Sequence, residues 1–218
     1  MIIIDYQGVK IQKLHHDTIR LHGSRVVYFD PFKIEKTTND ADVIFISHPH
    51  YDHCSVEDVE KVANMNTIIV CVPDCMSKFS GMNIKQVVPV EPNKVYDVNG
   101  VKIATIPAYN INKFCSPGMP FHPQEQEWVG YIVLIDGKKF YHSGDTDATP
   151  EMLALKNIDV AFVPVSGTYV MTAEEAAKAV NQFQPKLAIP IHYGAIVGAK
   201  SDAEKFKGLC SVKVEVLE

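Results

Sequence analysis

The chain carries the sequence Ser47-His48-Pro49-His50-Tyr51-Asp52-His53, in which four potential metal ligands fall within six residues. It follows directly on the apolar run Val43-Ile44-Phe45-Ile46, which has the pattern of a buried strand. A strand that ends at Ile46 delivers these polar residues to a loop, where several imidazoles and a carboxylate can turn toward one point. Imidazole with carboxylate is a ligand set that suits Zn, Fe or Mn. We therefore predict a metal site here, the alternative being a polar loop whose histidines only cap the strand.

Length and composition favour one folded domain over residues 1-218. Of the 218 residues, 46% are hydrophobic and 22% charged, so the chain can bury a core and neither disorder nor a fibrous repeat is indicated. The formal net charge is −5, with no block of Lys and Arg. Because a nucleic-acid backbone is normally met by a basic stripe, nucleic acid is disfavoured as a partner. A small-molecule substrate, phosphorylated or not, is favoured instead.

The same features predict a cytoplasmic protein with no membrane partner. No apolar run approaches the ~18 residues of a membrane span, and the N-terminus has neither the basic nor the long apolar region of a signal peptide. The five cysteines are odd in number and show no C-x-x-C spacing, which argues against a disulfide framework. A homo-oligomer is compatible with all of these features.

The first half of the sequence predicts a sheet that opens as antiparallel strands, with a helix after the ligand loop. Turn signals such as Gly8 and Gly23 separate short β-patterned runs. Ser55 is a good N-cap, and the apolar residues at 56, 59 and 62 recur at helical spacing. The expected strands cover 1–4, 9–14, 18–21, 26–29, 43–46, 67–72, 85–90, 94–98 and 101–106, with a helix over 55–64 and a short helix after Asp74.

The second half predicts strands that alternate with helices after a long irregular segment, 107–126. A segment of this length in a compact domain is usually functional. Asp136-Gly137 indicates a tight hairpin, and Thr172 with Glu175 forms the pattern of a capping box. Strands are expected over 128–135, 138–142, 159–165, 186–191 and 212–217, and helices over 150–155, 172–183 and 201–210.

Polar clusters follow strands at four stations, 48–53, 110–122, 142–147 and 192–193. If these strands belong to two sheets flanked by helices, one common edge can gather all four clusters.

On these stations the sequence resembles the metallo-β-lactamase superfamily, and within it the compact metal-dependent hydrolases of the ascorbate-6-phosphate lactonase type. The resemblance runs nearly end to end. It implies an α/β (α+β) fold, a four-layer αββα sandwich of two mixed β-sheets flanked by helices. The motifs that carry it are Asp30-Pro31, the cluster from His48 to His53, Pro107-Ala108-Tyr109-Asn110, Tyr141-His142-Ser143-Gly144-Asp145-Thr146 and Pro190-Ile191-His192.

The resemblance also implies a ligand set for two ions. It assigns His48 and His50 to a first metal and Asp52 and His53 to a second, with Asp145 bridging the two and His192 completing the second. Two Zn²⁺ ions are expected, with Mn²⁺, Fe²⁺ or Mg²⁺ as alternatives.

The third ligand of the first metal is where the sequence departs from the family pattern, since Asn110 stands where a histidine is usual. Three interpretations remain open. His122, in the same loop, replaces the missing imidazole; or Asn110 binds through its amide oxygen, which favours a harder metal such as Mn or Mg; or the first site is weak and one metal suffices.

Four further residues are candidates for supporting the ligands or contacting substrate. Asp30 can accept a hydrogen bond from a ligating imidazole. His16 matches a position where relatives often have a histidine near the metals. His142 is either such a contact or a satisfied core histidine, and Tyr193 either touches substrate or packs.

The function implied is hydrolysis of a small ester, lactone or phosphodiester, with the lactone or a phosphorylated small molecule favoured. At a mono- or dinuclear site, a metal-activated hydroxide is the expected nucleophile, because two divalent ions roughly 3.5 to 4 Å apart can lower the pKa of a shared water toward ~7. Asp52 is the expected catalytic residue, which orients this nucleophile or takes its proton. His16, or else a metal-bound water, is the candidate acid for the leaving group. The alternative is a non-catalytic metal-binding or sensing protein on the same fold, which Asn110 motivates.

Overall fold

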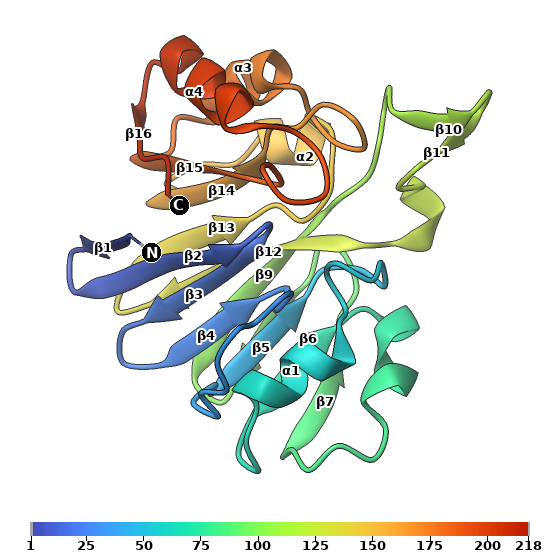
Figure 1. Cartoon of the computed structure of the whole chain (residues 1–218), viewed down its shortest axis with the longest axis vertical. Coiled ribbons are helices and arrows are strands. Elements are labelled where there is room, and N and C mark those ends of the chain that lie inside the picture. Colours follow the sequence, from blue (N-terminus) through green and yellow to red (C-terminus); the bar gives the residue numbers. More distant parts are fainter. Residues whose placement is uncertain (1, 218) are drawn as a thin grey trace.

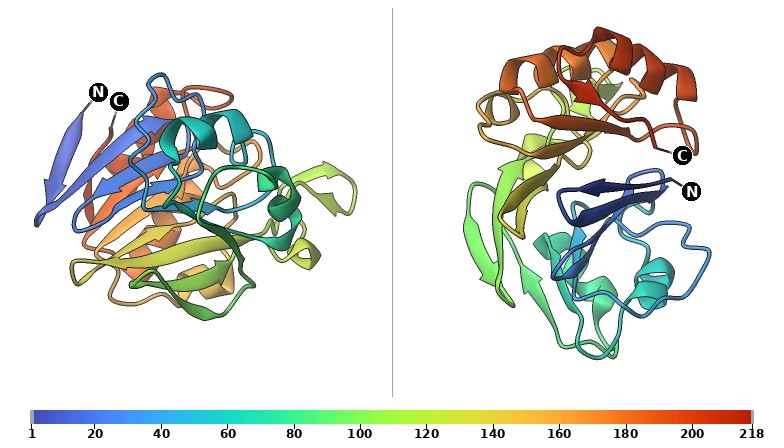
Figure 2. Two further views of the ribbon diagram at one scale, coloured as in Figure 1. Left: turned by 90° about the horizontal axis from the view of Figure 1, so that it is seen from below. Right: turned by 90° about the vertical axis from the view of Figure 1, so that its left-hand side faces the viewer.

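Two seven-stranded sheets stack face to face with helices on their outer sides, in a computed structural model that describes residues 2–217. Figure 1 shows the blue N-terminal strands lying against the yellow and orange strands of the second half. In the right-hand view of Figure 2, the red and orange helices cover one sheet and the teal helix covers the other. The predicted four-layer αββα sandwich of two mixed β-sheets is confirmed.

The first sheet has its strands in sequence order from β1 to β7. Strands β1 to β4 pair antiparallel, whereas β4 to β7 pair parallel. Its strands are β1 (Ile3–Tyr6), β2 (Val9–His15), β3 (Thr18–His22), β4 (Val26–Phe29), β5 (Val43–Ile46), β6 (Ile68–Cys71) and β7 (Gln86–Pro89). Met1, where the first strand was expected to begin, lies outside the described residues.

The second sheet runs in the order β16-β15-β14-β13-β12-β9-β8. From β8 to β13 its neighbours are antiparallel, and from β13 to β16 they are parallel. Its strands are β8 (Val95–Val98), β9 (Val101–Pro107), β12 (Val129–Ile135), β13 (Lys138–His142), β14 (Val160–Pro164), β15 (Leu187–Ile191) and β16 (Lys213–Val214).

Helices begin where the sequence supplies a cap. The Ser55 side chain accepts from the Asp58 N–H at the start of α1, and Thr172 with Glu175 forms the expected capping box of α3. The expected short helix after Asp74 is instead a 3₁₀ helix, η1 (Pro73–Phe79). The α-helices are α1 (Val56–Val62), α2 (Pro150–Leu153), α3 (Ala173–Phe183) and α4 (Lys200–Leu209). Among the described residues, no helix has both the length and the apolar character needed to cross a bilayer.

Strand β14 of the second sheet buries both of its faces, because its side chains alternate between two cores. On β14, Val160 and Phe162 lie in the core between the sheets, while Ala161 and Val163 pack in the core beneath the helices. The Tyr131 hydroxyl crosses between the sheets and donates to the Ile46 carbonyl at 2.8 Å. The end of β5, where the ligand loop begins, is thereby tied to the opposite sheet.

The segment 107–126 contains structure that its sequence did not predict. An arm of two short strands, β10 (Phe114–Ser116) and β11 (Met119–Pro120), projects from the body and is followed by the 3₁₀ helix η2 (Gln124–Gln126). All three residues of β10 are exposed, so this hairpin has no buried face and no alternating pattern. The expectation of a wholly irregular segment was wrong for this reason.

Strand direction brings the polar stations to one edge. The carboxyl ends of β4 and β5 and the turn from β2 into β3 lie at the same end of the first sheet, since Ile19 pairs with Phe29 and Phe29 with Phe45. In the second sheet β13, β14 and β15 run parallel, so their carboxyl ends also share an edge. The loops after these strands carry the candidate site.

Candidate metal centre

Three groups of histidine and aspartate side chains meet at this edge, and within each group the potential ligand atoms lie within 4.8 Å of one another. Two of the groups share His192. His50 is exposed, whereas the other members are buried. The groups are His48, His50 and His122; Asp17, His53, Asp145 and His192; and His16, Asp52 and His192.

In the first group, His48 and His50 lie two residues apart in the ligand loop, and their ring nitrogens face each other. Nδ1 of His48 donates to the Ser47 hydroxyl at 2.9 Å, and that hydroxyl donates in turn to Asp30 at 2.6 Å. Nε2 of His48 therefore faces Nδ1 of His50, 3.1 Å away. The Trp128 ring packs against both imidazoles, with centroids 5.2 and 5.1 Å away.

The structure brings His122 to this group, and Asn110 supports it from behind. The Asn110 side-chain oxygen accepts from the His122 N–H at 2.8 Å and from its Nδ1 at 2.9 Å. Nε2 of His122 is left pointing at Asp145 Oδ2, 3.3 Å away. The amide of Asn110 donates to the Tyr169 carbonyl, so its side chain is fully engaged by the protein.

In the second group, His53 and His192 are each held by a side chain on Nδ1. Asp30 lies 2.8 Å from Nδ1 of His53, and the Ser166 hydroxyl lies 2.9 Å from Nδ1 of His192. His192 has a φ of 57°, a left-handed backbone conformation that is sparsely populated by residues other than glycine. Both Nε2 atoms are thereby directed into the cluster.

Asp145 lies between the two groups. Its Oδ2 is 3.1 Å from Nε2 of His192 and 3.3 Å from Nε2 of His122, and its Oδ1 is 3.4 Å from Nε2 of His53. The loop that carries it runs against β12 so closely that a Cβ on Gly130 would stand 2.5 Å from the Ser143 carbonyl oxygen. Only glycine leaves room for this approach.

Asp52 is only 8% exposed and stands beside the second group. Its Oδ2 is 3.5 Å from Nε2 of His53 and 3.5 Å from Nε2 of His16. The ring of His16 packs against that of His192 at a tilt of 45°, with centroids 4.2 Å apart, and its side chain is fully buried. His16 thus lies behind Asp52, away from solvent.

Electrostatics differ between the two groups. Burial, reinforced by neighbouring imidazoles, lowers the pKa of His48 and of His50, which keeps both rings neutral and their lone pairs available. Burial also opposes charge on His192, but the carboxylates of Asp145 and Asp17 raise its pKa to about 9. Although burial acts in the other direction, His192 and His53 hold the pKa of Asp145 well below its usual range. The second group is thus rich in negative charge.

The side chains present fit divalent cations. Nε2 of His53, Nε2 of His122 and Oδ1 of Asp145 are buried and have no hydrogen-bond partner among the described residues. A buried polar atom without a partner is costly, and several such atoms converging on one point are what a cation satisfies. The donors are imidazole and carboxylate, which are ligands of Zn, Fe and Mn.

The remaining candidates lie around the cluster. Nε2 of His142 donates to the Asp17 carbonyl at 2.9 Å, and its ring stacks on Phe29, so it supports the turn rather than facing the cluster. Tyr193 is not brought to the cluster, because its hydroxyl donates to the Leu217 carbonyl at 2.9 Å. Asp17 is not among the site residues that the sequence predicts, although the predicted strands on either side of it place their turn at this edge.

The sequence and the structure were then compared with known proteins. The beta-lactamase superfamily domain model matches residues 10–192. A UPF0173 metal-dependent hydrolase of Thermococcus onnurineus is 31% identical, with 96% of this chain and 95% of that protein covered. A crystal structure from Parabacteroides distasonis, whose name proposes a metal-dependent hydrolase, has a TM-score of 0.79 at 28% identity and covers 96% of this chain and 94% of its own. Igni18, a metallo hydrolase of Ignicoccus hospitalis, shares the fold with a TM-score of 0.74 at 23% identity, covering 96% of this chain and 95% of its own.

Proposed function

This chain belongs to the metallo-β-lactamase superfamily, and on that premise we propose that it is a metal-dependent hydrolase with a dinuclear site. The first cation is held by His48, His50 and His122. The second is held by Asp52, His53 and His192. Asp145 contributes to both, and Zn²⁺ is the expected occupant of at least the first position.

The position of Asp145 is the observation that carries this proposal. A single carboxylate oxygen, Oδ2, lies within 3.3 Å of an imidazole nitrogen from each group, and both nitrogens point at it. A carboxylate between two sets of ligands is what joins two cations into one catalytic unit. A structural site for one ion would close four ligands around a single point instead.

Bound divalent cations would lower the pKa of a water and polarise the carbonyl or phosphoryl group under attack. Asp52 is placed to orient that water through a hydrogen bond, because it stands at the edge of the cluster with one oxygen 3.5 Å from His53. Burial would raise the pKa of Asp52, but the contacts with His16 and His53 lower it, so the side chain is an ionised hydrogen-bond acceptor at neutral pH.

The role of His16 is to position Asp52. Its side chain is fully buried, and its Nε2 lies 3.5 Å from the Asp52 carboxylate. A contact at that distance can align the carboxylate and stabilise its charge. We prefer this role to that of the acid for the leaving group, for which His16 is one of two candidates from the sequence.

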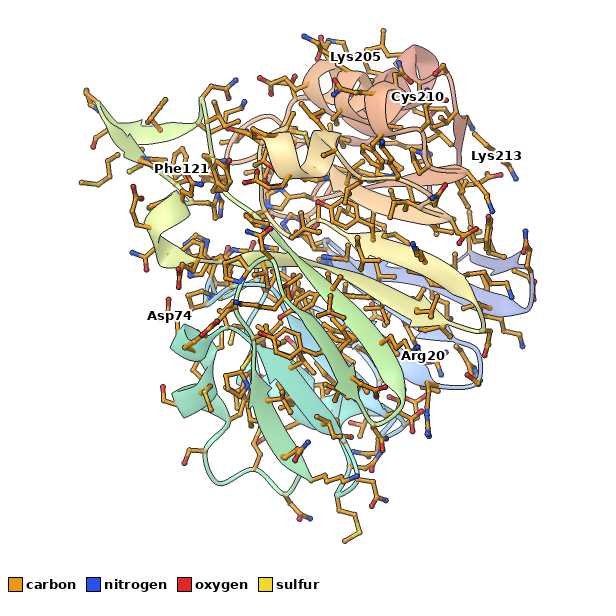
Figure 3. All side chains as sticks on the ribbon, turned by 180° about the vertical axis from the view of Figure 1, so that it is seen from behind. Arg20, Asp74, Phe121, Lys205, Cys210 and Lys213 are labelled. Atoms are coloured by element: carbon orange, nitrogen blue, oxygen red, sulfur yellow. The ribbon has the colours of Figure 1, made fainter. Side chains whose placement is uncertain are left out.

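Substrate reaches the site from the side of His50, the one exposed member of the three ligand groups. Tyr51, next to it, is 66% exposed, and Trp128 lies behind the imidazoles with its indole N–H donating to Asp74 on η1 at 3.1 Å. Figure 3 shows Asp74 and Phe121 on the same edge of the molecule, one from each half. The approach is therefore bordered by aromatic side chains from both halves.

The substrate class we favour is a small ester, lactone or phosphodiester, with the lactone or a phosphorylated small molecule first. Two loops are placed to select it, since Asn110 donates to Tyr169 and the Phe121 ring meets the Tyr169 ring with centroids 4.8 Å apart. The segment 107–126 and the loop over 166–171 thus form one joined border. A non-catalytic binding protein is less favoured. It was considered because Asn110 stands where the third imidazole is usual, and we propose that His122 supplies that imidazole.

A panel of chromogenic phosphodiester, lactone and β-lactam substrates, assayed with Zn²⁺ and with Mn²⁺, tests the proposal. We expect turnover of a phosphodiester or lactone that the His50→Ala variant loses by about 100-fold or more, as expected when a metal ligand is removed. His22→Ala, which removes an exposed histidine of β3, is the matched control and keeps wild-type activity. Tight metal binding with no turnover across the panel would support the binding protein instead.

A further inference from the structure

Asp17 is a buried carboxylate that neither the family pattern nor the proposed mechanism uses. It occupies the turn between β2 and β3 and is 0% exposed. Neither of its carboxylate oxygens has a hydrogen-bond partner among the described residues. Burying a carboxylate without partners costs several kcal/mol, so something must compensate its charge.

The carboxylate of Asp17 points into the second ligand group. Its Oδ2 is 3.3 Å from Nε2 of His53 and 4.0 Å from Nε2 of His192. Ligand atoms bound about 2.0 to 2.2 Å from one ion lie roughly 3 to 3.5 Å apart when adjacent and about 4 Å apart when opposite. The two distances have these values, and Asp145 completes the same group.

The backbone around Asp17 is fixed in this position. His142, fully buried and stacked on Phe29, donates from Nε2 to the Asp17 carbonyl at 2.9 Å. The preceding residue, His16, has a φ of 38°, which turns the chain sharply at this point. The turn therefore cannot move the residue out toward solvent without breaking a buried hydrogen bond.

We propose that Asp17 is an additional ligand of the second cation and makes that position selective for a harder metal, Mn²⁺ or Fe²⁺, while the first position selects Zn²⁺. This inference rests on the proposed dinuclear site. It makes the two positions chemically unequal, and the protein a mixed-metal hydrolase.

The donor sets of the two positions account for the selectivity. The first position has three imidazoles and a share of Asp145, which matches the four-coordinate nitrogen-rich sites that Zn²⁺ prefers. The second has two imidazoles, His53 and His192, with carboxylates from Asp17, Asp145 and Asp52 around them. Carboxylate ligands suit Mn²⁺, and selectivity among these metals is set by ligand type and geometry.

The test loads the metal-free full-length protein with one equivalent of Zn²⁺ and then titrates Mn²⁺, following free Mn²⁺ by electron paramagnetic resonance. Wild type is expected to bind one equivalent of Mn²⁺ without releasing Zn²⁺. Asp17→Asn, which keeps the shape but removes the charge, is expected to bind Mn²⁺ at least about tenfold more weakly while retaining Zn²⁺. Asp159→Asn is the matched control, since Asp159 is a buried carboxylate that instead pairs with Lys186.

The thermal shift caused by Mn²⁺ separates ligation from a structural role. If Asp17 binds the second cation, saturating Mn²⁺ raises the unfolding temperature of Zn²⁺-loaded wild type more than that of Zn²⁺-loaded Asp17→Asn, because ligand binding stabilises the folded state in proportion to its affinity. An equal rise in both proteins would mean that Asp17 is only an ion-pair partner of the imidazoles and would overturn the inference. Equal Mn²⁺ affinity in wild type and Asp17→Asn would overturn it too. A wild type that binds neither metal would instead contradict the proposed function.

Discussion

Four buried imidazoles are proposed as ligands of the two cations, and each has its Nδ1 engaged by a neighbouring side chain. The pairs are His48 with Ser47, His53 with Asp30, His122 with Asn110 and His192 with Ser166. An imidazole that donates from Nδ1 keeps Nε2 as a lone pair, so these partners select the tautomer that can bind a metal. Asp30 supports two of these ligands at once. Its Oδ2 accepts from Nδ1 of His53 and from the Ser47 hydroxyl, which in turn holds His48.

Asn110 and His122 have separable roles that metal analysis can distinguish. We expect His122→Ala to lower the metal content from about two ions per chain to about one, because it removes an imidazole from the first position. Asn110→Ala keeps that imidazole but removes the oxygen that holds its Nδ1, so it should retain both ions at saturation with about 10- to 100-fold weaker affinity for one. Metal per chain after equilibration in excess Zn²⁺ and gel filtration is the measurement.

The opposite result would mean that Asn110, and not His122, is the third ligand of the first cation. If His122→Ala still carries two ions and Asn110→Ala carries one, the amide oxygen binds the metal and the hydrogen bonds to His122 are broken in the loaded protein. His15→Ala is a suitable control, because His15 lies at the end of β2 and stacks edge-on against Phe32, outside the three ligand groups.

The sequence could predict the residues that cluster along the chain, but not those that meet through folding. His48 to His53 stand together, so their convergence needs only one loop. The choice between Asn110 and His122 depends on how an irregular segment folds, for which no periodicity exists to read. Asp17 was overlooked because a single aspartate in a turn is ordinary. Its place in the site becomes apparent only in the folded sheet, where strand pairing brings the turn between β2 and β3 beside the end of β4.

At the scale of elements, alternation of apolar residues predicted strands well wherever a face is buried. Strand β9 shows this, since its buried and less buried residues alternate along its whole length. The arm formed by β10 and β11 could not be predicted from alternation, because both of its strands are largely exposed. Short strands such as β16 also extend over fewer residues than their apolar runs, because strand pairing stops before the apolar pattern does.

Helix α1 is attached to the loop between β4 and β5 through Asp58, and this attachment should depend on pH. The Asp58 carboxylate accepts from the N–H groups of Lys33 and Ile34, both at 2.9 Å, and from the Ser55 hydroxyl at 2.7 Å. Burial would raise the pKa of Asp58, but the hydrogen bonds from Ser55 and Lys61 and from these N–H groups lower it below its ordinary value. The ionised form is therefore the one that stabilises the fold.

We expect Asp58→Asn to lower the free energy of unfolding by about 1 to 3 kcal/mol at pH 7, because an amide can satisfy only one of the two backbone donors. A depressed carboxyl pKa stabilises fully above the unfolded value of about 3.9, and this contribution is lost as the pH falls through the folded value. Urea unfolding of both proteins between pH 7 and pH 3 should show a difference that is constant near neutrality and narrows below about pH 4. A difference that stays constant to pH 3 would mean that the charge of Asp58 is not what stabilises the loop.

At the scale of the whole molecule, the site exists only because the two halves are packed together. The first sheet supplies His48, His50, Asp52 and His53 from the loop after β5, while the loops after β13 and β15 of the second sheet supply Asp145 and His192. The inter-sheet core and the Tyr131 hydroxyl hold these edges in register. Cations shared through Asp145 would add a further link between the halves, so metal binding should stabilise the entire fold.

We propose that this chain holds two divalent cations joined by Asp145. The number of ions per chain tests this proposal most directly. The protein saturated with Zn²⁺ and Mn²⁺, freed of excess metal and analysed by mass spectrometry against its concentration, should contain about two ions per chain. Asp145→Asn should lose affinity for both. A saturated wild type with one ion or none, or an Asp145→Asn variant that binds two as tightly as wild type, would contradict the shared dinuclear site.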